Sequence, residues 1–148
     1  MNRYTPQAAV LTDLILEVFR LNGQLLAQGD HLTAQLGLTS ARWQVLGALA
    51  LESRALTVAQ IARKMGLKRQ SVQRLVDILV TQGVLLLREN PEHKRAKLVE
   101  LTSTGRELYQ QLEQIQIQWV NDLAQGIELE ALNYSIALLR QLRQRLER

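Results

Sequence analysis

The chain has 148 residues, of which 47% are hydrophobic, values that fit one globular domain and exclude a disordered chain. It has no cysteine, which excludes disulfides, cysteine-ligated zinc, iron–sulfur clusters and thiol redox sensing. Its formal net charge is +4, no apolar run approaches the ~20 residues that span a bilayer, and residues 1–7 lack a signal-peptide core, so we expect a cytoplasmic protein with no membrane association.

The first predicted helix covers residues 8–27. Apolar residues recur in it at helical spacing, namely Leu11, Leu14, Ile15, Val18, Leu21, Leu25 and Leu26. Val10, Leu16 and Phe19 make a second face apolar, which is more than a helix on a monomer surface needs. We therefore expect burial against two partners, one of them a second subunit, and an end of the helix at Gly29-Asp30.

Two capped helices are expected next. Thr39 or Ser40 suits the cap of a helix over residues 41–50. Thr57, with Gln60 three residues later, matches a capping box and predicts a short helix that ends near Gly66, a residue suited to a left-handed turn.

A second helix over residues 68–82, ended by Gly83, completes a helix-turn-helix. Its buried stripe consists of Val72, Leu75, Val76 and Leu79. The opposite side carries polar and basic residues, namely Gln70, Gln73, Arg74 and Asp77, with Lys68 and Arg69 at the start.

A short hairpin and two long helices follow. Residues 84–88 and 97–101 read as strands, and the turn chemistry of residues 90–95 joins them. A helix-turn-helix followed by a hairpin with a basic tip is a winged helix. Thr102 is placed to cap a helix over residues 103–125, Gly126 ends it, and a last helix starts at Glu128. The fold class is therefore mainly α with a small β-hairpin wing.

The positive charge is concentrated in the winged-helix segment. Residues 63–97 contain nine Lys or Arg and three Asp or Glu, a net of +6, so the other residues together carry −2. A basic block in an otherwise slightly acidic chain is typical of a nucleic-acid footprint, although a solvated charged face has the same composition.

The strongest similarity lies in residues 56–108, which read LTVAQIARKMGLKRQSVQRLVDILVTQGVLLLRENPEHKRAKLVELTSTGREL. Their order and spacing resemble the MarR family of bacterial winged-helix regulators, and residues 38–46 resemble that family's second helix. The resemblance implies one MarR-type domain over residues 1–148, with a DNA-binding lobe at 38–102 and dimerisation helices at 8–28 and 103–148. It also implies a homodimer and a cleft for a small aromatic or phenolic effector.

Two positions depart from the family pattern. The wing usually has Asp before its Arg, whereas this chain has His93 followed by Lys94 and Arg95, so the wing is expected to be less pre-organised. The recognition helix opens with Lys68-Arg69-Gln70 where Ser is common, which predicts a weak cap.

The candidate DNA-binding residues follow from this arrangement. On the recognition helix, Gln70 and Gln73 suit adenine and Arg74 suits guanine. Lys68, Arg69 and Ser71, at the helix start, suit phosphates. We expect Asp77 to lie away from the DNA backbone or to pair with Arg74.

Further candidates lie in the wing and at the start of the preceding helix. Arg95 suits minor-groove insertion, and Lys94 and Arg88 suit phosphate contacts. Thr57 either offers its backbone N–H to a phosphate or only caps its helix.

Other kinds of site have little support. Trp43 and Trp119 suit the core better than a ligand pocket, Trp43 being the weak ligand candidate. His31 and His93 are too few and too far apart for a metal site, and the sequence has no nucleophile elbow, no plausible catalytic triad and no Gly-rich phosphate loop. We therefore expect no enzyme activity, metal or cofactor. The predicted function is a sequence-specific, double-stranded DNA-binding, ligand-responsive repressor acting as a homodimer on a pseudo-palindromic operator. The alternatives are an architectural or activating DNA-binding protein without a ligand, and a winged helix that binds an acidic protein partner.

Overall fold

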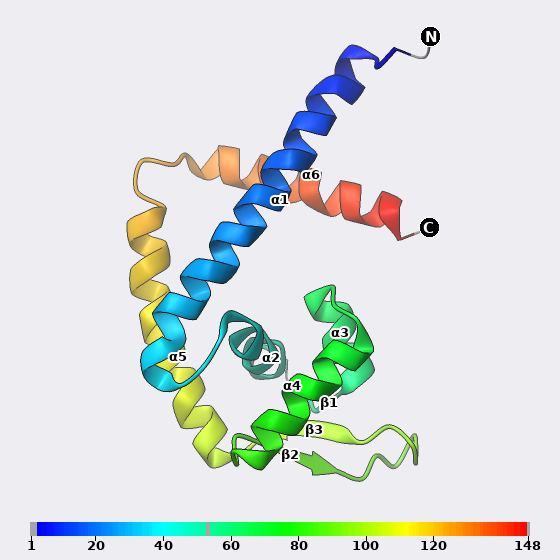
Figure 1. Cartoon of the computed structure of the whole chain (residues 1–148), viewed down its shortest axis with the longest axis vertical. Coiled ribbons are helices and arrows are strands. Elements are labelled where there is room, and N and C mark those ends of the chain that lie inside the picture. Colours follow the sequence, from blue (N-terminus) through cyan, green and yellow to red (C-terminus); the bar gives the residue numbers. More distant parts are fainter. Residues whose placement is uncertain (1–2, 53, 148) are drawn as a thin grey trace. The chain divides into compact units, whose positions relative to one another are not determined.

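The computed structural model describes residues 3–52 and 54–147 (Figure 1). In chain order the elements are α1 (Pro6–Thr33), the 3₁₀ turn η1 (Ala34–Leu36), α2 (Ser40–Ala50), β1 (Leu56–Thr57), α3 (Val58–Met65), α4 (Arg69–Thr81), β2 (Leu85–Arg88), β3 (Leu98–Leu101), α5 (Ser103–Leu123) and α6 (Leu129–Leu146). They form two compact units, Met1–Glu113 and Gln114–Arg148, and α5 runs from the first into the second. The expected fold class is confirmed.

Helix α1 is longer than the sequence pattern predicted. We expected it to end at Gly29-Asp30, but it continues to Thr33, because an isolated glycine is tolerated inside a helix at a cost of about 1 kcal/mol. Only glycine fits at this position without a clash, since a Cβ on Gly29 would lie 2.5 Å from the Ser40 Oγ at the start of α2. Thr33 is fully buried, and its hydroxyl shares one proton between the carbonyls of Gly29 and Leu38, at 2.7 and 3.0 Å. The close approach of α2 therefore explains the glycine.

The predicted caps of the helix-turn-helix are confirmed. The Thr39 Oγ1 accepts a hydrogen bond from the Arg42 N–H at 3.2 Å, and Thr57 and Gln60 form the complete capping box at the start of α3. Gly66 and Gly83 have φ angles of 66° and 74°, the left-handed conformation that glycine adopts without strain. As expected, no side chain caps the N-terminus of α4, which follows Lys68.

The sheet has three antiparallel strands in the order β1-β3-β2. Leu85 pairs with Leu101 and Arg88 with Leu98 in the predicted hairpin. We did not predict β1, in which Leu56 pairs with Val99 and Thr57 with Leu98. Two residues are too few to show a strand period, and β1 exists because Leu56 and Val99 are both buried at the base of the wing.

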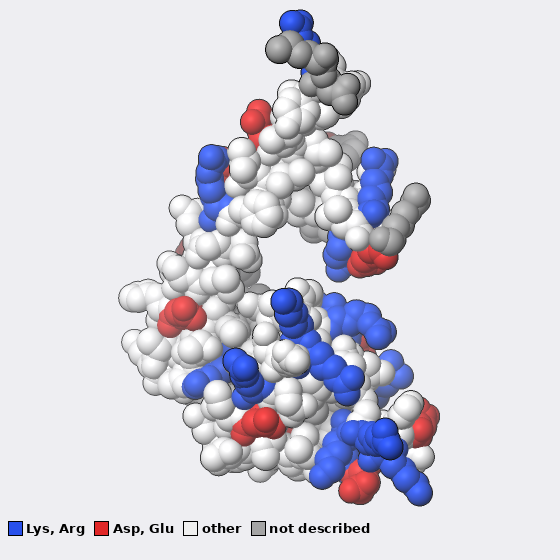
Figure 2. Space-filling view, turned by 45° about the vertical axis from the view of Figure 1, so that its right-hand side comes forward, with Lys and Arg blue, Asp and Glu red and all other residues white. Residues whose placement is uncertain are grey.

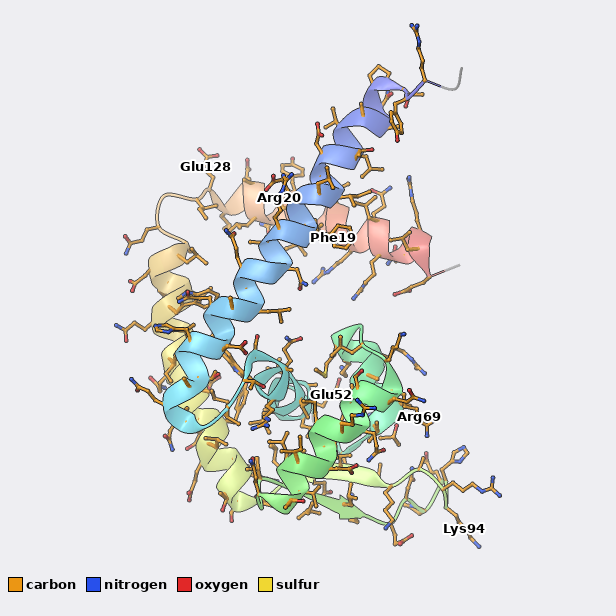
Figure 3. The ribbon with its side chains drawn as sticks, in the orientation of Figure 1. Phe19, Arg20, Glu52, Arg69, Lys94 and Glu128 are labelled. Carbon is orange, nitrogen blue, oxygen red and sulfur yellow. The ribbon has the colours of Figure 1, made fainter. Side chains whose placement is uncertain are left out.

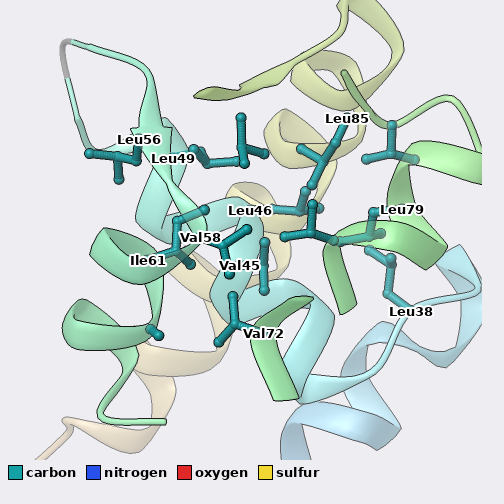
Figure 4. Packing of buried hydrophobic residues seen from close by; sticks show 14 of the residues in the cluster. Leu38, Val45, Leu46, Leu49, Leu56, Val58, Ile61, Val72, Leu79 and Leu85 are labelled. Carbon is teal, nitrogen blue, oxygen red and sulfur yellow. The ribbon is translucent and has the colours of Figure 1, made fainter. Parts of the chain in front are cut away.

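The core of the first unit lies between α2, α3, α4 and the sheet (Figure 4). Its fully buried residues are Val45, Leu46, Leu56, Ile61, Val72, Val76, Leu79, Leu85, Val99 and Leu112. The recognition helix contributes Val72, Val76 and Leu79 to it, so its opposite face is held outward.

Helix α6 forms most of the second unit. None of its described residues is buried, and its exposed apolar residues include Leu132, Ile136 and Leu139. Among the described residues, no helix is long and apolar enough to cross a membrane.

Gly105 gives a stability prediction. A Cβ there would lie 2.2 Å from the backbone oxygen of Val84, which also accepts hydrogen bonds from the N–H and hydroxyl of Thr102. We therefore expect Gly105→Ala to lower the free energy of unfolding by about 1–3 kcal/mol, measured by urea denaturation at one protein concentration.

Gly47→Ala is the matched control, because its Cβ meets only Tyr109, at 3.9 Å. It should leave the stability unchanged or raise it by up to about 1 kcal/mol, since alanine is the better helix former. Equal losses from both variants would contradict the backbone clash.

Candidate nucleic-acid interface

The outer face of α4 carries the residues that we expected to contact DNA. The exposed residues of this face and of the position before the helix are Lys68, Arg69, Gln70, Ser71, Gln73 and Arg74. Val72 and Val76, which alternate with them along the helix, are 0% exposed. Burial of one side therefore fixes which side chains a ligand can reach, and those side chains are amides, a hydroxyl and cations.

The turn at the wing tip is closed by three hydrogen bonds from backbone N–H groups. The N–H groups of Glu92 and His93 donate to the Asn90 side chain and carbonyl, at 3.1 and 3.2 Å. The Ala96 N–H donates to the His93 carbonyl at 3.3 Å. Lys94 and Arg95 are exposed at this tip, and Figure 3 shows Lys94 projecting from it away from the body of the lobe. The turn is thus hydrogen-bonded, and the expected weaker pre-organisation of the wing stays a prediction.

A groove lies between the wing, α4 and the start of α3. Its volume is about 180 Å³, and it is lined by Thr57, Val58, Ala59, Arg69, Gln73, Leu87, Arg95, Ala96 and Lys97. Arg69, Arg95 and Lys97 bring three cations to one hollow from two separate segments of the chain. The N-terminus of α3 adds its positive dipole end and backbone N–H groups. The groove is thus suited to an anion the size of a phosphate group.

Sequence reasoning missed Lys97 as a site residue. It was counted in the basic block but assigned only to a strand. The available signal was its place in the basic block, directly before β3 and two residues after Arg95.

Thr57 lines the groove, yet its own N–H is already used. That N–H donates to the Gln60 Oε1 at 2.9 Å within the capping box. Of the two alternatives for Thr57, the structure favours capping, because the N–H that would bind a phosphate already takes part in the capping box. The first-turn N–H groups of Val58 and Ala59 remain the backbone donors at this helix end.

Two other expected partners differ in the structure. Asp77 does not pair with Arg74; its Oδ1 accepts a hydrogen bond from the Gln73 Nε2 at 2.9 Å. Arg88, expected to contact phosphate, forms an ion pair with Glu100 across the wing strands, with 2.8 Å between Nη2 and Oε1. An ion pair this exposed contributes little free energy. Arg88 is therefore able to bind a phosphate, but only by giving up its pair with Glu100.

The basic block is contiguous in space as well as in sequence. Figure 2 shows Lys and Arg side chains gathered over the wing and the neighbouring helices of the lobe. Figure 3 places Arg69 at the exposed edge of α4, facing the same side as the wing. Phosphates on one strand of a nucleic acid would meet several of these cations at once.

A second hollow, of about 560 Å³, lies on the lobe between the end of α2, β3 and the first half of α5. It is lined by Leu49, Ala50, Leu51, Glu52, Arg54, Ala55, Val99, Glu100, Leu101, Arg106, Tyr109, Gln110 and Glu113. The hydrogen bond and charge of Lys64 lower the pKa of the Glu52 carboxyl, while burial and the Glu113 carboxylate raise the pKa of the Tyr109 hydroxyl. The lining contains both acidic and basic side chains, so its charge indicates no preference between anionic and cationic ligands.

The tryptophans do not line either hollow. Trp43 is half-buried and packs against the core of the lobe, and Trp119 is half-buried in α5. Within residues 3–52 and 54–147, no group of three or more His, Cys, Asp or Glu side chains is placed to hold a metal ion.

Comparisons with other proteins give a consistent picture. The model of the MarR family matches residues 36–96. The uncharacterized protein Rv2011c of Mycobacterium tuberculosis is 40% identical over 129 residues, which cover 87% of this chain and 89% of that protein. The transcriptional activatory protein BadR of Rhodopseudomonas palustris is 27% identical over 106 residues, which cover 70% of this chain and 61% of BadR.

Solved structures share the fold. The MarR/EmrR family transcriptional regulator from Acinetobacter sp. ADP1 has a TM-score of 0.83 at 22% identity, over 93% of this chain and 97% of that chain. CouR from Rhodococcus jostii RHA1, solved with p-coumaroyl-CoA bound, has a TM-score of 0.79 at 22% identity, over 88% of this chain and 91% of that chain. The family match spans the helix-turn-helix and most of the wing, and the shared fold extends over nearly the whole chain. The chain therefore belongs to the MarR family of DNA-binding transcriptional regulators.

Proposed function

We propose that two copies of this chain form a homodimer that binds a pseudo-palindromic operator, with α4 in the major groove and the wing tip in the adjacent minor groove. The observation that supports this best is the groove in which Arg69, Arg95 and Lys97 converge beside the N-terminus of α3. An anion site between a recognition helix and a wing would hold the DNA strand that separates the two grooves. Two recognition helices would then read half-sites about one turn, ~34–36 Å, apart.

Each exposed side chain has a role in this proposal. Gln70, Gln73 and Arg74 read base edges, whereas Arg69 and Lys97 bind phosphate. Lys68 and Ser71 add phosphate contacts at the start of α4, and Lys94 adds one at the wing tip. The Arg95 side chain extends from the protein groove into the minor groove of the DNA, whose negative electrostatic potential is stronger in A·T-rich sequence. Residues 38–102 form the DNA-binding lobe, and no step of this function is catalytic.

The helices at 8–28 and 103–148 are the proposed dimerisation region. Helix α1 exposes Val10, Leu16, Phe19 and Leu21, with Phe19 68% exposed. The exposed apolar residues of α6 include Leu129, Leu132, Ile136, Leu138 and Leu139. Monomeric proteins rarely leave apolar surface of this extent in water, so we assign a second copy of the chain as its cover.

We also propose that the dimer responds to a small-molecule ligand and acts as a repressor. CouR was solved with an aromatic acyl-CoA, which supports an aromatic or phenolic effector for this chain as well. Repression would follow if the dimer occupies a promoter, whereas the name of BadR supports activation as the second candidate. Transcription in vitro from the bound promoter decides between them, since added protein lowers transcript yield in the first case and raises it in the second.

The salt dependence of binding tests the DNA interface. If about eight phosphates are contacted per dimer, log K should fall with log salt at a slope of roughly −7. Lys97→Ala removes two contacts per dimer and should make the slope shallower by roughly 2, with similar loss on every sequence. The measurement is fluorescence anisotropy with an operator selected from genomic DNA.

Arg3→Ala is the control, because Arg3 is exposed before the start of α1 and lies outside both the lobe and the dimerisation helices. It should leave the slope unchanged. A slope near zero for the unmodified protein would favour the protein-partner alternative. Specific binding less than about a thousandfold tighter than non-specific binding would favour an architectural role.

The dimer interface is tested by Phe19→Asp. A charge placed in an apolar interface is strongly destabilising, so we expect the variant to sediment as a monomer at micromolar concentration where the unmodified chain is a dimer. Gln24→Asp introduces the same residue about 140° away around α1 and should stay dimeric. Dimers in both cases would show that the Phe19 face is not the interface.

Effector response is tested with p-coumaroyl-CoA, p-coumarate and benzoate as probes. A ligand that binds the DNA-free protein more tightly than the DNA-bound protein lowers the affinity for the operator. At saturation, the factor equals the ratio of the ligand's affinities for those two states. We expect at least one probe to weaken binding about tenfold or more at saturation, a coupling of about 1.4 kcal/mol. No effect of any probe would favour a regulator without an aromatic ligand.

A further inference from the structure

Asp77 is an acid on a helix face that is otherwise polar and basic. It is exposed on α4, one helical turn after Gln73, and phosphates would repel it. Among the described residues it takes part in no ion pair, so charge pairing does not account for it. Its carboxylate has instead one side-chain partner, the Gln73 amide at 2.9 Å.

This hydrogen bond fixes the direction of the Gln73 amide. A carboxylate only accepts hydrogen bonds, so the Gln73 atom that faces Asp77 is the nitrogen. The flipped amide would bring its carbonyl oxygen against the carboxylate, which places two acceptors face to face. Gln73 also lines the groove beside the wing, so the fixed amide belongs to the proposed DNA surface.

The fixed amide matches one purine better than the other. After one N–H is given to Asp77, Gln73 keeps a carbonyl acceptor and a second N–H donor. Adenine presents an N6 donor and an N7 acceptor in the major groove, which complement these two groups. Guanine presents two acceptors, N7 and O6, and a glutamine satisfies them well only if its amide is free to turn its nitrogen toward both.

We propose that Asp77 is a positioning residue that makes Gln73 select adenine over guanine at one base pair of the operator. The inference rests on the proposed function, in which α4 enters the major groove. It assigns to Asp77 a role in specificity at the expense of overall affinity, because its negative charge weakens binding to every sequence.

The test is a double-mutant cycle on base preference. The operator selected from genomic DNA is varied one base pair at a time, and Gln73→Ala identifies the position that Gln73 reads. At that position we expect the unmodified protein to prefer A·T over G·C by roughly 5- to 150-fold. Asp77→Ala should lower this ratio at least about fivefold while raising the affinity for all sequences. In the Gln73→Ala background, Asp77→Ala should leave the ratio unchanged.

Two further variants separate orientation from charge. Asp77→Asn removes the same charge as Asp77→Ala but keeps a side chain that either accepts or donates, so it tolerates both amide directions and should lose the preference as well. Asp77→Glu keeps an acceptor-only carboxylate and should retain most of the preference. Thermal melting of every variant shows that the lobe stays folded.

Three outcomes would overturn the inference. The first is that Asp77→Ala changes the affinity for all sequences by one factor and leaves the A·T to G·C ratio intact. The second is that Gln73→Ala alters no base preference at any position. The third, an unmodified protein that binds all DNA sequences equally, removes the proposed function itself and this inference with it.

Discussion

The proposed DNA-facing surface depends on one buried cluster, in which Val72 and Val76 of α4 pack with Leu46 of α2 and Val99 of β3. Each of these side chains is 0% exposed. The same cluster therefore packs both α4 and the base of the wing. The groove between them is a consequence of this packing, and so is the outward direction of Gln70, Gln73 and Arg74.

Electrostatics then acts on a surface that packing has already shaped. The chain carries +6 in residues 63–97 and −2 elsewhere, which directs anions toward the lobe. Ion pairs moderate this field locally, since Lys64 pairs with Glu52 and Arg88 with Glu100. The cations left to converge on the groove are Arg69, Arg95 and Lys97, and they are the ones next to a helix N-terminus.

The acid on the recognition helix illustrates a balance between affinity and specificity. Non-specific binding to DNA is dominated by phosphate contacts, which Asp77 opposes. Its hydrogen bond to Gln73 has little value for the stability of an exposed helix, about 0.2–0.5 kcal/mol. The same bond has a larger consequence for recognition, because it determines whether a donor or an acceptor faces a base.

Most of the secondary structure was predictable because it depends on neighbours in the chain. Thr39, Thr57 and Thr102 act as caps, Gly66 and Gly83 end helices, and the spacing of Val72 and Val76 marks the buried side of α4. The Gln73–Asp77 bond is also local, because it joins residues four apart on one helix. The sequence contained this signal, although we expected Asp77 to lie away from the DNA backbone or to pair with Arg74.

Features that join distant residues could be found only in three dimensions. The strand β1 exists through its pairing with β3, and the close approach of Ser40 to α1 explains the glycine at position 29. The engagement of Arg88 by Glu100 and the meeting of Arg69 with Lys97 depend likewise on which segments pack together. Local pattern thus specified the elements and their polar faces, whereas packing between elements specified which cations converge and which are already paired.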